Sequence, residues 1–76
     1  MSLESIINNN TYCKITLLLN NKLYMFSGKV KKHKEEVYKF IPLEKDKKSF
    51  LFTKDFIISI KEFNLLEIIL IEFSQS

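Results

Sequence analysis

Apolar and polar residues alternate along most of the chain, a pattern typical of β-strands with one buried face. Over residues 12–19, Cys13 and every second residue after it are apolar, while Lys14 and Thr16 share the other face with Leu18. The same reasoning predicts strands over 23–32, 37–43, 49–53 and 56–60. Five short strands with turns roughly every ten residues indicate an all-β barrel or sandwich rather than a parallel α/β sheet.

Turn-forming residues separate these strands. Asparagine tolerates the left-handed backbone of tight hairpins, so Asn20 and Asn21 predict a turn between the first two strands. Charged turns are expected over 32–36 and 44–48. Gly28, the only glycine, lies inside the second predicted strand, where glycine marks a bulge or a sharp bend. A strongly bent second strand is what a small barrel needs in order to close.

The two ends of the chain differ from this pattern. Residues 1–10 predict a short helix that is capped by Ser2 and ended by three asparagines. In the segment 61–76, Asn64 and Glu67 have capping-box spacing, which favours a helix. Residues 65–71 are nevertheless apolar all round and rich in β-branched side chains, which favours a buried strand. We expect the strand, in a hairpin with 56–62, and keep the helix as the alternative.

Length and composition allow one domain of 76 residues with a normal hydrophobic fraction of 46%. One cysteine, Cys13, and one histidine, His33, form no intrachain disulfide and no zinc site, so no cofactor or metal is expected. Small domains without such links gain stability by self-association, which predicts a homo-oligomer. Neither a signal peptide nor a membrane span is recognisable, and we expect an intracellular, cytoplasmic protein.

Charge is distributed unevenly along the chain. All twelve basic residues are lysines; residues 1–54 carry eleven lysines against five acids, and residues 55–76 carry one lysine against four acids. The two parts therefore have net charges of +6 and −3, which add up to the total of +3. A basic region of this kind attracts polyanions, and the acidic region could pair with a neighbouring subunit.

The densest positive charge is the run over 29–34. The run predicts a phosphate-binding track close to Tyr24 and Phe26, and the competing interpretation is a solvated turn partly neutralised by acids. Tyrosines could stack on bases, although burial in the core is the simpler expectation for Tyr12, Tyr24 and Tyr38. The predicted nucleic-acid-binding residues are Lys29, Lys31, Lys32, Lys34 and Lys54.

A short N-terminal helix, a second strand bent at Gly28 and five strands in 76 residues resemble the Sm-like family, and within it the Hfq-type small β-barrels. Leu19, Asn20 and Asn21 resemble the turn between the family's first two strands, and residues 28–30 resemble its motif of a glycine, any residue and an apolar residue in strand two. Residues 54–57 are similar to the Hfq stretch in which a lysine and a histidine precede an apolar pair. The sequence departs from the family at Lys34, Tyr38 and Asp55. The resemblance implies a five- to six-stranded SH3/Sm-like barrel over 12–60, and a ring of subunits that binds single-stranded RNA, with Lys54 as the remnant of that site.

Two functions from different classes follow from these observations. The first is an oligomeric barrel that binds single-stranded nucleic acid, RNA before DNA, through its lysines. The second is a protein–protein interaction module, such as an accessory protein of a virus or mobile element, that assembles through the apolar segment 65–73. An enzyme is not expected, because no nucleophile has an obvious histidine partner and no glycine-rich phosphate loop exists.

Overall fold

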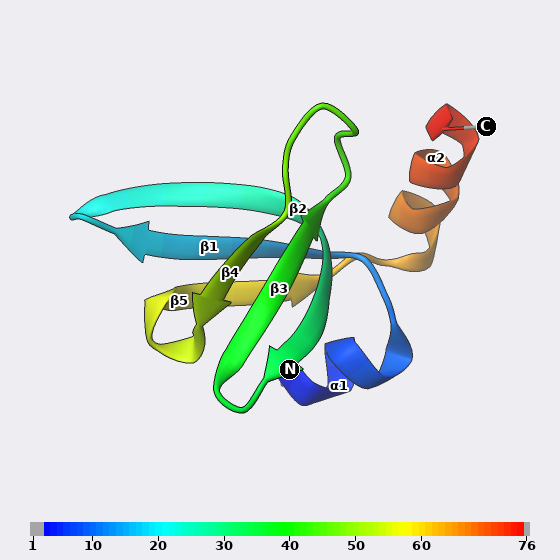
Figure 1. Cartoon of the computed structure of the whole chain (residues 1–76). Helices are drawn as coiled ribbons and strands as arrows, with labels where there is room; N and C mark the ends of the chain where they lie inside the picture. Colours follow the sequence, from blue (N-terminus) through cyan, green and yellow to red (C-terminus); the bar gives the residue numbers. More distant parts are fainter. Residues whose placement is uncertain (1–2, 76) are drawn as a thin grey trace.

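The computed structural model describes residues 3–75, which form one five-stranded antiparallel sheet with a helix near each end of the chain (Figure 1). The elements are α1 (Leu3–Asn9), β1 (Cys13–Leu19), β2 (Lys22–Lys34), β3 (Val37–Pro42), β4 (Phe50–Thr53), the 3-10 turn η1 (Lys54–Phe56), β5 (Ile57–Glu62) and α2 (Leu65–Gln75). The β-rich class and the short N-terminal helix are thus confirmed, whereas the predicted cap at Ser2 lies outside the described residues.

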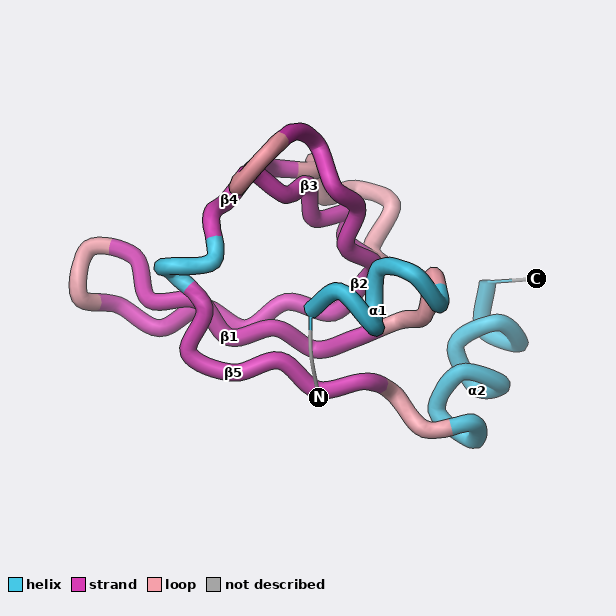
Figure 2. Tube along the Cα trace, turned by 90° about the horizontal axis from the view of Figure 1, so that it is seen from below, coloured by secondary structure: helices cyan, strands magenta, loops and turns pink. Residues whose placement is uncertain are grey.

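The strands are arranged in the order β4-β3-β2-β1-β5, so β4 and β5 form the two edges. Within residues 3–75 these edge strands do not pair with each other, and the sheet is not closed. Figure 2 shows the sheet curling, with β3 and β4 above the β1–β5 part. The predicted barrel is therefore not confirmed, although the strands expected for it are present.

Gly28 is the point at which β2 passes from one half of the sheet to the other. The first half of β2 pairs with β1, its second half pairs with β3, and Gly28 alone has partners on both sides, Cys13 and Pro42. A β-carbon at this position would lie 2.9 Å from Ile41 C and Pro42 Cα, and closer still to the Ile41 carbonyl oxygen. Glycine is required here because the backbone of β3 occupies the space of a side chain.

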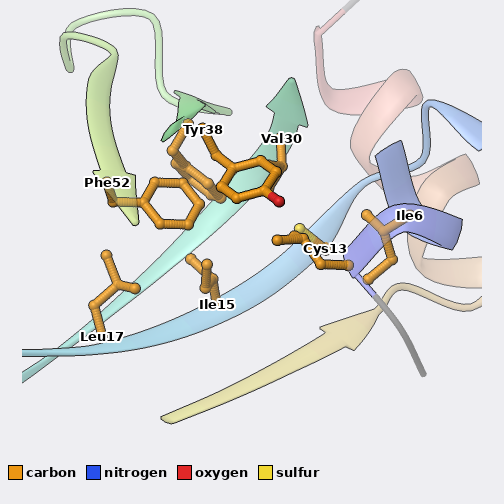
Figure 3. Close-up of a cluster of buried hydrophobic side chains, with 9 residues drawn as sticks. Ile6, Cys13, Ile15, Leu17, Val30, Tyr38 and Phe52 are labelled. Carbon is orange, nitrogen blue, oxygen red and sulfur yellow. The ribbon is translucent and has the colours of Figure 1, made fainter. Parts of the chain in front are cut away.

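The core lies on the concave side of the curled sheet. Alternate residues of the strands point into it, as Figure 3 shows for Ile15, Val30 and Phe52. Helix α1 adds Leu3 and Ile6, which are both buried, and thereby covers part of the same side. Burial of Leu3 and Ile6 thus gives α1 the tertiary packing that a helix of two turns needs in order to persist. The other buried members of the cluster are Cys13, Leu17, Tyr38 and Phe40.

The first turn lies at the predicted asparagines, whereas the first charged turn begins later in the chain than predicted. Asn20 and Asn21 have φ values of 52° and 64°, as the mirror-image hairpin turn requires. Strand β2 continues to Lys34, and only Glu35 and Glu36 form the next turn. The prediction of a charged turn over 32–36 was therefore wrong at its start, since the pairing of β2 with β3 extends the strand.

The C-terminal segment is a helix, so the expected strand and its hairpin with 56–62 were wrong. The Glu67 amide donates to Asn64 Oδ1 at 2.8 Å, and the Asn64 amide donates to Glu67 Oε1 at 3.1 Å. This reciprocal capping box satisfies two amide groups that the first helical turn leaves free. Local capping thus outweighed the strand preference of the β-branched side chains.

Candidate nucleic-acid interface

One side of the sheet faces away from the core and carries a lysine on four of the five strands. Side chains alternate between the two sides of a strand, so the neighbours of the buried residues point outward. We call the resulting set the lysine face: Lys14 on β1, Lys29 and Lys31 on β2, Lys39 on β3 and Lys61 on β5.

Cross-strand pairing sets like charges opposite each other on the lysine face. Lys31 pairs with Lys39, and Lys14 pairs with Lys61. Such pairs are mildly destabilising, because like charges then lie one strand spacing apart. The only acid in the five strands is Glu62, which pairs with Cys13 and belongs to the core side. The strands thus offer these lysines no carboxylate, and an anionic ligand would relieve the repulsion.

Aromatic rings adjoin the lysines at one end of this face. The Lys29 ammonium lies 4.7 Å from the centre of the Tyr12 ring, and that of Lys14 lies 5.6 Å from the Phe63 ring. Phe63 is buried, whereas Tyr12 is half-buried and borders a hollow of about 260 Å³. The hollow is lined by Tyr12, Lys29, Ile41, Pro42, Leu43 and Lys45. A half-buried aromatic ring beside a lysine ammonium suits a base that is flanked by a phosphate.

The five lysines predicted from the sequence do not share one surface. Lys29 and Lys31 belong to the lysine face. Lys32 lies opposite the buried Tyr38, on the core side of β2, and is exposed. Lys34 follows a bulge and pairs with Val37. Alternation along a strand therefore divides a run of lysines that appears continuous in the sequence.

Lys54 is engaged elsewhere. It lies in η1, and its ammonium group donates to Glu4 Oε1 at 2.7 Å. This hydrogen bond raises the pKa of Lys54 and lowers the pKa of Glu4, which Lys32 lowers further through its charge. The pair is exposed and adds little to stability. It does tie Lys54 to α1 on the core side of the sheet, apart from the lysine face.

The aromatic neighbours expected for the lysine run were also assigned to the wrong side. Tyr24 stacks on Phe26 with 6.3 Å between ring centres, and Phe26 packs against Phe40 and Phe50 of the core. Tyr38 is buried, as expected. Both Tyr24 and Phe26 therefore lie on the side of β2 opposite Lys29, and Tyr12 contacts the lysine face through Lys29.

Sequence reasoning missed Lys14, Lys39, Lys61 and the part played by Tyr12. Lys14 had been assigned to the polar face of its strand, and the same alternation extends to the other two lysines. Alternation gives the face of a strand on which a residue lies but not the register between strands. The pairing of β1 with β5 and of β2 with β3 brings these residues beside one another.

Other kinds of site find little support in residues 3–75. No group of three acidic, histidine or cysteine side chains in this range could hold a metal ion. None of the helices described has the length and apolar character needed to cross a membrane. Comparisons of the chain with protein-family models, with curated proteins and with solved structures gave no match. The Sm-like resemblance stays a prediction, and the molecule is defined by its geometry as a small antiparallel β-protein with a basic outer face.

Proposed function

We propose that this protein binds single-stranded nucleic acid along the lysine face, with RNA as the first candidate. The observation that carries the proposal is the set of five lysines on one side of the sheet, two pairs of them directly opposed, with no acid among the strand residues of that side. Lysines that neutralise phosphates release counterions, and this release supplies most of the affinity of binding that ignores sequence.

The chemistry of the site favours single strands and little sequence preference. Lysine presents a mobile point charge, whereas bidentate reading of guanine relies on the planar fork of arginine, which this chain lacks. Tyr12 can stack on an unpaired base in the hollow beside Lys29 and Lys45. Stacking contributes about 1–3 kcal/mol per base and accepts any base.

Fluorescence anisotropy with labelled single-stranded RNA and DNA, titrated at several salt concentrations, tests the proposal. In the variant Lys29→Glu/Lys31→Glu/Lys39→Glu we expect binding to weaken by at least about tenfold. The slope of log K against log salt should become shallower by about 2, since each lost phosphate contact on a single strand contributes about 0.7.

The matched control is Lys22→Glu/Lys34→Glu/Lys48→Glu, which changes the net charge equally at exposed positions outside the lysine face. If both triple variants lost affinity for nucleic acid equally, the overall charge would explain the effect, and the proposal of a specific lysine face would be contradicted. Tyr12→Leu should weaken binding by about fivefold or more without changing the salt slope, because it removes stacking and no charge.

A second function, that of a protein-interaction module, is favoured by one specific observation. Helix α2 exposes most of its large apolar side chains, and Phe73 is 81% exposed. Contiguous apolar patches of more than a few hundred Å² are uncommon on monomers and mark interaction sites. Truncation after Phe63 should abolish assembly without weakening nucleic-acid binding if α2 serves only assembly.

A further inference from the structure

Helix α2 has one apolar side that is largely exposed within the part of the chain that the structure describes. Leu65, Ile69 and Phe73 follow one another at intervals of four residues, and Leu66 and Leu70 form the adjacent row. At 3.6 residues per turn these five side chains occupy an arc of about 140°. All five are between 51% and 81% exposed. Figure 1 and Figure 2 both show α2 standing away from the sheet.

Another side of α2 meets the rest of the chain. Leu70, Ile71 and Ser74 border a hollow whose other wall is the 43–45 turn. An isolated helix of 11 residues is marginal in water unless its apolar side is packed. The exposed arc of α2 is therefore available to a second molecule, whose packing would stabilise the helix.

The charges that flank this arc are all negative. Glu67 and Glu72 lie on its two borders, and the described part of α2 carries no basic residue. Two α2 helices packed against each other would bring four carboxylates together with nothing to neutralise them. A complementary surface should be apolar in the middle and basic beside it.

The outer side of the sheet has this composition. On the hairpin of β1 and β2, Leu18 pairs with Leu23, and Met25 follows on the same side. These three residues, 39%, 64% and 75% exposed, form what we call the hairpin patch. Along the same face the patch borders a pair of lysines. Thr16 pairs with Met25 of the patch, and two residues from Thr16 along β1, Lys14 pairs with Lys61. Apolar area and positive charge thus adjoin in the arrangement that α2 complements.

We infer that α2 of one copy docks on the outer sheet face of a second copy. Its apolar arc covers the hairpin patch, and its glutamates approach Lys14 and Lys61. Each copy contributes one helix and one face, so the contact closes as a reciprocal dimer or a ring. This interface does not depend on nucleic-acid binding, but it occupies part of the same face, so assembly and nucleic acid compete.

Sedimentation equilibrium of protein freed of nucleic acid measures the association. We expect Glu67→Gln/Glu72→Lys, in which the glutamine keeps the capping box with Asn64, to weaken it by at least about tenfold. We expect Lys14→Glu/Lys61→Glu, added to that variant, to restore the association, because the exchanged charges again attract each other. Met25→Lys should weaken association as strongly as Ile69→Lys. All these positions are exposed or half-exposed, so circular dichroism can confirm that each variant is folded.

Three outcomes would overturn the inference. A wild-type protein that stays monomeric at all accessible concentrations has no such interface. Association that is unchanged by Met25→Lys but lost in Ile69→Lys would assign the contact to helix pairing. If the charge-exchanged variant did not recover its association, the glutamates of α2 would not lie close to Lys14 and Lys61 in the assembly. None of these results bears on nucleic-acid binding, which anisotropy measures independently in the monomeric variant Ile69→Lys.

Discussion

Replacing Gly28 with alanine tests the close contact between β2 and β3 on which the bend of the sheet depends. The added methyl group would meet Ile41 and Pro42 at 2.9 Å or less, and the atoms that it meets belong to the backbone of β3. Backbone atoms cannot rotate away as a side chain does. The two strands must therefore separate where Gly28 and Pro42 pair.

The expected loss follows from two opposing effects. Overpacking costs about 1–3 kcal/mol, and a rigid neighbour places this case at the upper end. Alanine recovers about 0.4–1 kcal/mol because the unfolded chain has less freedom. The net loss is about 2 kcal/mol, a large share of the roughly 4–11 kcal/mol that a chain of this size has. The midpoint of urea unfolding should fall by about 2 M if m is about 1 kcal/mol/M.

Urea unfolding followed by circular dichroism measures this loss of stability. The wild type and the variants are compared at one fixed protein concentration, because the contribution of association to stability depends on concentration. The control is Ser27→Ala, which adds no atoms at the neighbouring position and should change stability by no more than about 0.5 kcal/mol. If Gly28→Ala unfolded at the same urea concentration as Ser27→Ala, the space beside Gly28 would not be filled by β3, and the reason given for the bend would be refuted.

Two further predictions concern the buried thiol and the cap of α2. Burial, assisted by the charge of Glu62, raises the pKa of Cys13 to about 11, so a thiol reagent at pH 8 should react only as the protein unfolds. The contribution of Cys13 to stability should be constant below pH 9 and be lost progressively between pH 9 and 11, because the unfolded thiol ionises first. Rapid labelling of the folded protein would contradict this burial. Asn64→Ala should cost α2 about 1 kcal/mol, seen as a loss of helical Cα chemical shifts in 65–75, with the sheet shifts unchanged.

The strands were predictable because their signals are local. Alternation placed all five within about two residues of their observed ends, and the asparagine pair gave the first turn. The C-terminal segment was assigned wrongly, because the strand preference of its apolar β-branched residues was set above the capping signal. The two hydrogen bonds between Asn64 and Glu67 decided for the helix. That capping spacing was visible in the sequence but was given too little weight.

The sequence by itself determined the chemistry: a small β-rich domain with lysine as its only basic residue, a single thiol, and an apolar, acidic C-terminal segment. Tertiary structure alone decided which of these residues act together. Alternation along the sequence already separates Lys32 from Lys29 and Lys31, but only strand pairing brought Lys14 beside Lys61 and Lys31 beside Lys39. Register and packing join residues far apart in the chain, so a surface depends on pairings that no single segment encodes.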